Sequence, residues 1–263
     1  SYKDIERYKN KISSKIVLNK IYDPYNLDNL NNNKLNIFDF NNSNRKSNMI
    51  LSQIELSNNL SKNMNVDLVT MPINKGILKR EINFIGVTEY LGYLNNQETI
   101  MLLYGENFSV TPYTTHINVK KVHLSFKKKL LNNYLNNLQK FIKKKEYKLN
   151  FKNINFLCFN PHCGENNTIG NEDEFLSNQI KNFRNISGPY PADSAFTNIK
   201  KNSLFITTYH DQALIPFKAL NKKGINITLG LSYRRLSPAH GTAKDIKYKN
   251  KADNTSYIAC MSI

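Results

Sequence analysis

Three histidines lie far apart in the chain, each inside a dense polar motif. His116 follows two threonines, His162 lies in Asn-Pro-His-Cys-Gly-Glu (160–165), and His210 lies in Tyr-His-Asp-Gln (209–212). The chain has only 5 histidines, so these motifs hold most of them. Divalent metals bind where nitrogen and oxygen donors from distant segments converge. We therefore predict that His116, His162 and His210 bind a divalent metal with open positions for a substrate, and that Asp211 orients an imidazole.

Several cationic and small polar residues suggest an anionic ligand. Lys75 follows Thr-Met-Pro-Ile-Asn (70–74), and Lys218 lies eight residues beyond His210. Arg235 and Ser237 precede the run His240, Gly241, Thr242 and Ala243. Arginine, serine and threonine donors around a glycine turn suit phosphate or carboxylate. The chain lacks Gly-x-Gly-x-x-Gly, so we expect no standard dinucleotide turn, although a nucleotide can bind on the loop 240–243.

The elements that must position these residues follow from the spacing of apolar residues. Short apolar runs predict strands, and a helical rhythm predicts helices. The predicted strands are 66–70, 99–103, 109–115, 154–159, 204–209 and 225–230, and the predicted helices are 47–63, 122–145 and 172–183. Residues 1–65 carry few motifs, and the Asn-rich stretch 27–44 predicts loop with short strands.

The alternation of strands and helices predicts an α/β fold with a largely parallel sheet. Each of the three histidines follows a predicted strand. Ligands of such folds collect at the carboxyl ends of the strands, so we expect the three histidines to share one cavity.

Charge and composition limit the classes of function. The net charge is +17 with 22% charged residues, which would suit a nucleic-acid partner. The lysines accompany an excess of Asn, Ile and Tyr, and their runs flank a predicted amphipathic helix, so we expect no nucleic acid. The chain has no apolar stretch of about 18 residues, the length that would predict a membrane span, and its first residues are polar. Three cysteines without Cys-x-x-Cys spacing favour reduced thiols and a cytoplasmic location.

Blocks that contain these motifs resemble the PdxA family, the 4-hydroxythreonine-4-phosphate dehydrogenases of vitamin B6 biosynthesis. They run in family order from about residue 66 onward. The blocks are TMPINK (70–75), GVTEYL (86–91), TTHINVKKVH (114–123), NPHCGENNTIGNEDE (160–174), GPYPADSAF (188–196), YHDQALIPFKAL (209–220), GINITLGLSYRRLSPAHGTAKDI (224–246) and KAD (251–253).

This resemblance implies a two-lobed α/β/α fold similar to isocitrate and isopropylmalate dehydrogenases. We assign residues 1–80 and 205–263 to a lobe on the cofactor side, and residues 81–204 to a lobe on the metal and dimerisation side. The family implies a homodimer whose active site includes residues of both subunits.

The resemblance also implies the chemistry. The family oxidises 4-phosphooxy-L-threonine, a small phosphorylated amino acid, and decarboxylates the product to 3-amino-2-oxopropyl phosphate. It uses NAD (or NADP) and a divalent metal (Zn, Mg or Co). His116, His162 and His210 match the metal ligands. Thr88, Lys218, Asn226 and Arg235 match substrate positions, and His240, Gly241, Thr242 and Ala243 would lie near the cofactor. Lys218 and Asp211 are the candidate acid–base residues.

The chain departs from the family pattern in ways that keep alternatives open. Val87 replaces a substrate-contacting histidine, and the family's glycine-rich first turn is missing. A glycine is also lost after Asp245-Ile246. The departures suggest a fragment, a shrunken protein or a decaying gene product. Two alternatives are a related dehydrogenase for another hydroxy acid and a non-catalytic remnant.

Overall fold

An eight-stranded sheet organises most of the chain, in the order β3-β10-β9-β4-β5-β8-β6-β7. The computed structural model describes residues 2–12, 15–39, 46–78, 84–246, 249 and 251–263. The strands of this sheet are β3 (Leu68–Val69), β4 (Ile100–Tyr104), β5 (Ser109–Thr114), β6 (Asn153–Leu157), β7 (Ile186–Tyr190), β8 (Ser203–Tyr209), β9 (Ile225–Leu229) and β10 (Arg235–Pro238). All six predicted strands are confirmed, and β7 and β10 are additional.

Parallel pairings outnumber antiparallel ones in this sheet. Four neighbouring pairs are parallel (β3–β10, β5–β8, β8–β6 and β6–β7) and three are antiparallel (β10–β9, β9–β4 and β4–β5). The predicted α/β class with a largely parallel sheet is confirmed. The parallel group β5-β8-β6 brings three carboxyl ends to the same edge of the sheet, which is the edge where ligands of such folds bind.

The chain divides into two compact units, Ser1–Val66 with Gly76–Asn83, and Asp67–Lys75 with Phe84–Ile263. The first holds the helices α1 (Tyr2–Ile12) and α2 (Lys46–Met64), the turn η1 (Leu27–Asn29) and a parallel pair of strands, β1 (Leu18–Ile21) and β2 (Leu35–Phe38). The predicted helix at 47–63 and the short strands in 27–44 are confirmed in part by α2 and β2, whereas 40–45 lie outside the described residues. Strands from both predicted lobes enter the large sheet of the second unit, and the lobe boundaries stay a prediction.

The second unit also contains most of the helices. They are α4 (Val87–Asn95), α5 (Lys128–Ile142), α6 (Glu172–Ile180), α7 (His210–Leu220) and α8 (Thr255–Met261), and α3 (Lys75–Leu78) begins there. The single-turn helices are η2 (Val119–Ser125), η3 (Lys145–Tyr147), η4 (Pro161–Gly164) and η5 (Lys244–Ile246). Among the described residues, no helix has the length and apolar character that a bilayer crossing requires.

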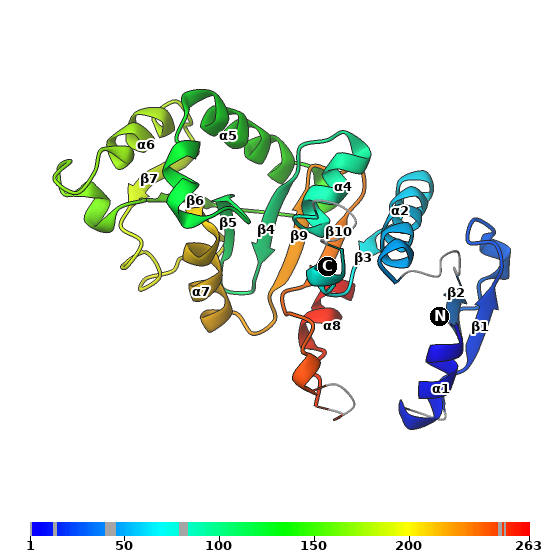
Figure 1. Ribbon diagram of the computed structural model, residues 1–263. Helices are drawn as coiled ribbons and strands as arrows, with labels where there is room; N and C mark the ends of the chain where they lie inside the picture. The colour runs from blue at the N-terminus through cyan, green and yellow to red at the C-terminus, as the bar shows by residue number, and fades with distance from the viewer. Residues whose placement is uncertain (1, 13–14, 40–45, 79–83, 247–248, 250) are drawn as a thin grey trace. The chain divides into compact units, whose positions relative to one another are not determined.

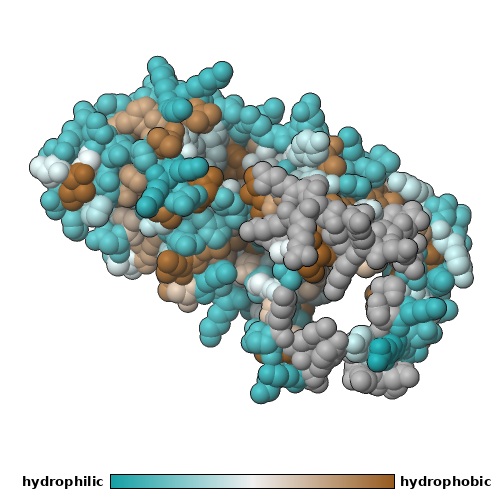
Figure 2. All heavy atoms as spheres, in the orientation of Figure 1, coloured by the Kyte–Doolittle hydropathy of each residue, from teal (hydrophilic) through white to brown (hydrophobic). Residues whose placement is uncertain are grey.

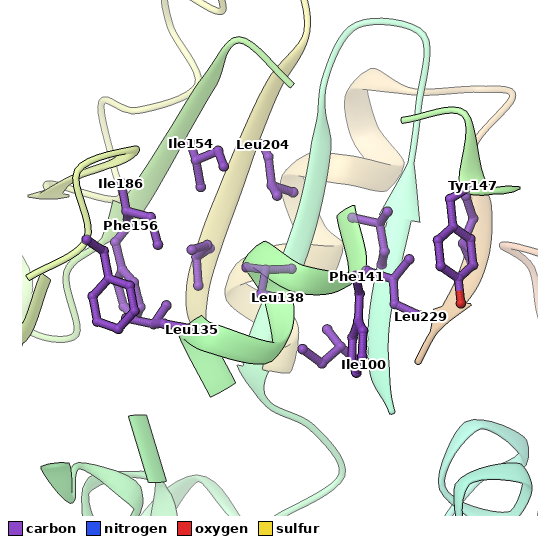
Figure 3. Close-up of a cluster of buried hydrophobic side chains, with 14 of the residues drawn as sticks. Ile100, Leu135, Leu138, Phe141, Tyr147, Ile154, Phe156, Ile186, Leu204 and Leu229 are labelled. Carbon is purple, nitrogen blue, oxygen red and sulfur yellow. The ribbon is translucent and has the colours of Figure 1, made fainter. Parts of the chain in front are cut away.

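Apolar residues alternate along the central strands and therefore feed two separate cores. Leu102 packs in a cluster with Leu135 and Leu138 of α5, whereas its neighbours Met101 and Leu103 pack with Phe217 of α7. This alternation is the period of two that a strand imposes on its side chains. Helices α5 and α6 cover one face of the sheet and α7 covers the other (Figure 1). Figure 3 shows the side chains of α5 pointing at those of the strands.

The visible surface fits this division between core and exterior. Hydrophilic residues cover much of the face shown in Figure 2, and hydrophobic residues form smaller groups among them. Several apolar side chains remain exposed, such as Tyr93 and Ile215 at 80% and 70%. Such scattered exposure is ordinary for a folded protein.

The predicted helix at 122–145 begins later than the sequence pattern indicated. Residues Val119–Ser125 form the single-turn helix η2, and α5 starts at Lys128. Phe126 packs against Tyr113 and Phe159, with ring centroids 6.1 and 5.0 Å apart. These tertiary contacts hold Phe126 and Lys127 in non-helical conformations, and they override the local helical rhythm.

The two adjacent leucines at the start of α5 provide a direct test of this packing. Leu131 is 0% exposed and Leu130 is 50% exposed. We expect Leu131→Ala to lower the free energy of unfolding by about 2–5 kcal/mol, because it leaves a cavity in the core. Leu130→Ala should change it by less than about 0.5 kcal/mol. Denaturant unfolding measures both, and equal losses would contradict the helix orientation.

Candidate functional site

A cavity of about 300 Å³ in the second unit gathers most of the polar residues singled out above. Its walls come from the loop after β3, the start of α4, the face of β4, one side of α7 and the strands β9 and β10. The candidate residues that line it are Thr88, His116, His210, Lys218, Asn226, Arg235, His240, Gly241 and Thr242. Val87 and Glu89 line it as well.

Two of the three predicted metal ligands face each other in this cavity. His116 lies two residues after β5 ends, and His210 is the first residue of α7, directly after β8. Because β5 and β8 are parallel neighbours, their carboxyl ends bring the two rings to a centroid distance of 5.5 Å, with 40° between the ring planes.

A carboxylate contacts Nδ1 of each of these two rings. Glu89 Oε1 lies 2.9 Å from His116 Nδ1, and Asp211 Oδ1 lies 2.7 Å from His210 Nδ1. Carboxylate partners of this kind orient histidines that bind metals. The two side-chain environments differ, because the Glu89 side chain is 29% exposed and that of Asp211 is 68% exposed.

His162 occupies a different position. It lies in the turn η4 after β6, is exposed, and is not among the residues that line the cavity. Within the described residues, no group of three His, Cys, Asp or Glu side chains is placed to hold a metal ion. The structure therefore brings His116 and His210 together and leaves His162 apart from them in the single chain.

Two polar side chains without a predicted role, one buried and one partly buried, hold the segments around the histidines. The carboxylate of Asp173, 2% exposed, accepts hydrogen bonds from the backbone N–H groups of Phe159 and Asn160, at 2.6 and 2.9 Å. Gln212 accepts from the Thr208 backbone at 2.8 Å and donates to the Cys158 carbonyl at 2.9 Å. Asp173 therefore holds the segment before His162 in place, and Gln212 links the start of α7 to the residue that follows β6.

The side chain of Arg235 is a buried cation at the base of the cavity. It is 4% exposed, and its guanidinium donates to Thr70 (3.0 Å), Thr228 (3.1 Å) and Thr88 (3.4 Å). None of the ion pairs between described residues includes it. Burial lowers the pKa of Arg235 to about 10, so it remains positively charged at neutral pH. A buried charge without a counter-ion is costly, and the cavity therefore favours an anionic ligand.

Lys218 and Asn226 complete the polar surface of the cavity. Lys218 lies on α7 two helical turns beyond His210, so it shares one helix face with His210 and Leu214. Oδ1 of Asn226 is buried without a hydrogen-bond partner in the described part of the chain. A buried acceptor of this kind requires a donor from a ligand or water. The side chain of Lys75 lies outside the described residues.

The loop from His240 to Ala243 lies on the rim of the cavity. His240, Gly241 and Thr242 line it, while Ala243 lines an adjoining cavity with His240 and Gly241. All four residues are exposed, and a Cβ at Gly241 would meet no atom within 4 Å. The loop therefore has room beside it for a large ligand.

Asp211 does not line the cavity, whereas Lys218 does. Asp211 instead accepts the hydrogen bond from His210. Of the two candidate acid–base residues, Lys218 is therefore the one at the cavity surface.

Comparisons with known proteins show to which family this chain belongs. The family model described as "Pyridoxal phosphate biosynthetic protein PdxA" matches residues 4–263, which extends the resemblance into the motif-poor first 65 residues. A 4-hydroxythreonine-4-phosphate dehydrogenase of Hydrogenobaculum sp. is 39% identical over 203 residues, 75% of this chain and 64% of that protein. One from Campylobacter fetus is 39% identical over 202 residues, with 73% and 64% coverage.

A solved structure agrees with these relatives. The crystal structure of 4-hydroxythreonine-4-phosphate dehydrogenase from Klebsiella pneumoniae has a TM-score of 0.79 and 25% identity, over 99% of this chain and 87% of that one. The part of this chain that matches the curated relatives above spans slightly less than two thirds of their length, 64% in each case. The family model covers nearly the whole chain, and the protein therefore belongs to the PdxA family of pyridoxal phosphate biosynthetic proteins.

Proposed function

We propose that this protein oxidises and decarboxylates 4-phosphooxy-L-threonine to 3-amino-2-oxopropyl phosphate, using NAD and a divalent metal, in vitamin B6 biosynthesis. The observation that carries the proposal is a buried, ion-pair-free arginine in the same cavity as two carboxylate-held imidazoles. An anion site beside a metal site suits a substrate with a phosphate, a carboxylate and a hydroxyl group. The names of the relatives support this substrate.

In this proposal the substrate binds through four residues of the cavity. Arg235 and Lys218 supply positive charge for the phosphate and the carboxylate, because guanidinium and ammonium groups form strong charge-assisted hydrogen bonds to such anions. Thr88 holds the Arg235 guanidinium at 3.4 Å and so presents it to the substrate. Oδ1 of Asn226, buried without a partner among the described residues, accepts from the substrate's ammonium or hydroxyl group.

The donor set around the two facing histidines fits a divalent metal. A carboxylate that accepts from Nδ1 makes Nε2 the nitrogen that carries the lone pair, and neutral imidazole nitrogen suits zinc and cobalt. His116, His162 and His210 would hold the ion in a homodimer whose subunits share the active site. When bound, the metal polarises the substrate oxygen and stabilises negative charge on it.

The loop His240–Ala243 would contact NAD, which accepts hydride from the substrate alcohol when it is bound. Lys218 is positioned on the cavity surface to take the hydroxyl proton and to return a proton after loss of carbon dioxide. The apolar side chains of Met101 and Leu103 in β4 also line the cavity.

Turnover by the purified protein tests this proposal. We expect NADH to form from 4-phosphooxy-L-threonine only when NAD and a divalent metal are both present, because each supplies a separate part of the chemistry. 4-Hydroxy-L-threonine, the same molecule without the phosphate, serves as the control and should react much more slowly. Absorbance of NADH gives the rate. A folded protein that forms no NADH with Zn²⁺, Mg²⁺ or Co²⁺ would contradict the proposed activity.

A second candidate function, dehydrogenation of a different hydroxy acid, is favoured by one residue. Val87 lines the cavity where the family pattern has histidine, and valine can neither donate nor accept a hydrogen bond. If the substrate is 4-phosphooxy-L-threonine, Val87→His should lower its KM. If another acid is the substrate, the same variant should leave or raise the KM for 4-phosphooxy-L-threonine. No turnover in either form, with metal still bound, would instead identify a non-catalytic remnant.

A further inference from the structure

Glu89 contacts the strand end that carries His116 through a single carboxylate oxygen. Its Oε1 lies 2.9 Å from His116 Nδ1 and accepts a second hydrogen bond from Thr115 Oγ1 at 3.2 Å. Glu89 lies in the first turn of α4, whereas Thr115 and His116 follow β5. The bond therefore joins two separate elements at the edge of the cavity.

The hydrogen bond determines which ring nitrogen carries the proton. A carboxylate only accepts hydrogen bonds, so neutral His116 must hold its proton on Nδ1 when it contacts Glu89. Nε2 then carries the lone pair, which is what a metal ion requires of an imidazole. An imidazole without such a carboxylate would be divided between the two tautomers.

The backbone of His116 makes this partner more important. Its φ angle is +23°, a region that residues other than glycine rarely occupy because the backbone is strained there. The surrounding structure must stabilise such a conformation. The two hydrogen bonds from residues 115 and 116 to Glu89 are contacts that do so.

Gly86 shows how closely the ring and the carboxylate are packed. A Cβ at this position would lie 2.5 Å from Glu89 Oε2 and 3.3 Å from His116 Cε1. The φ angle of Gly86 is −172°, so its backbone suits any residue and the requirement is one of space alone. A side chain at position 86 would therefore require the Glu89 carboxylate to shift.

The other histidine of the pair has a weaker version of the same arrangement. His210 contacts Asp211, its neighbour in sequence, and the side chain of Asp211 is 68% exposed. Water competes for so exposed a carboxylate. Glu89, at 29% exposure, is the more shielded partner and should restrict its histidine more strongly.

We propose that Glu89 is a positioning residue that holds His116 in the Nδ1–H tautomer and so presents Nε2 to the divalent metal. The metal part of this inference rests on the proposed function. The tautomer part concerns the protein without metal and can be measured independently.

Nitrogen NMR of the metal-free protein, labelled with ¹⁵N-histidine, tests the tautomer directly. In the neutral form of the ring, which the two ¹⁵N signals themselves identify, we expect His116 to show the Nδ1–H pattern in the unmodified chain. Glu89→Ala should lose this pattern, because no carboxylate then accepts from Nδ1. Glu89→Gln should retain part of it, because the amide oxygen can still accept.

Two further variants separate positioning from general effects on folding. Glu98→Ala removes a carboxylate that bonds only asparagines in the described structure, Asn133 and Asn137, and should leave the His116 pattern unchanged. Gly86→Ala keeps Glu89 but requires its carboxylate to shift, and should weaken the pattern. A His116 ring that carries its proton on Nε2 in the unmodified protein, or keeps it on Nδ1 in Glu89→Ala, would overturn the proposal.

Cobalt titration then measures the consequence for the metal. We expect Glu89→Ala to weaken Co²⁺ binding by about 10- to 100-fold, the usual effect of losing a carboxylate behind a ligating histidine. Glu89→Gln should weaken it less, and Glu98→Ala should not weaken it. Unchanged Co²⁺ affinity in Glu89→Ala would refute the metal-positioning role. If the unmodified protein binds no Co²⁺, the proposed function fails, and the NMR result still decides the tautomer.

Discussion

Arg235→Met should weaken binding of 4-phosphooxy-L-threonine by about 100-fold or more, or about 3 kcal/mol, while leaving the free protein as stable as before or more so. The guanidinium is 4% exposed and has no ion-pair partner among the described residues. Without the guanidinium, the substrate anion loses a buried charge-assisted hydrogen bond. The same change relieves the free protein of a buried charge that forms no ion pair among the described residues. Steady-state KM and denaturant unfolding measure the two effects.

Arg234→Met provides a matched control for this experiment. The two arginines are adjacent and their replacement changes the net charge equally, yet Arg234 pairs with Asp67 and donates to the Ile263 carbonyl at 3.2 Å. Its replacement should leave the KM unchanged and lower the stability by up to about 1 kcal/mol, because the pair is partly exposed. Equal increases in KM for both variants would show that general charge, and not the buried guanidinium, attracts the substrate.

His116→Ala and His210→Ala should each weaken metal binding by more than about 100-fold. Loss of a residue that only supports a ligand already costs about 10- to 100-fold, and these two imidazoles face each other at 5.5 Å. Metal content after dialysis and Co²⁺ absorbance are the measurements. His123→Ala is the control, since His123 is exposed in η2 and does not line the cavity.

His162→Ala examines the third predicted ligand separately. If the proposed function is right, the His162→Ala homodimer should lose metal as the other two variants do. Unchanged metal stoichiometry in this variant would remove His162 from the ligand set. His116 and His210 would then be the metal ligands that the protein supplies.

Much of the fold could be predicted because it depends on local patterns. Short apolar runs predicted six strands, and all six are present. The boundaries of α5 could not be predicted, because Phe126 leaves the helix to pack against Tyr113 and Phe159. A contact with residues 13 and 33 positions away has no signal in a local window.

The residues of the candidate site also fall into those that the sequence predicted and those that it did not. The residue types in the histidine motifs and their places after strands indicated a cavity at the carboxyl ends. The carboxylate behind His116 was not predicted, because Glu89 is 27 residues away from it in sequence. Asp173 was missed for the same reason, although its position in the acidic first turn of α6 was a possible signal.

The sequence alone determined the α/β class, the family and the residue types available for chemistry, because periodicity and motif spacing are properties of the chain itself. The family resemblance already pointed to Arg235, and only the tertiary structure decided that its guanidinium is buried in the cavity while that of its neighbour Arg234 pairs with Asp67. Successive residues of a strand point to opposite sides, and a sequence does not say which side faces a cavity. The same holds for the histidines: parallel pairing of β5 with β8 placed His116 against His210, and packing of α4 against them supplied Glu89.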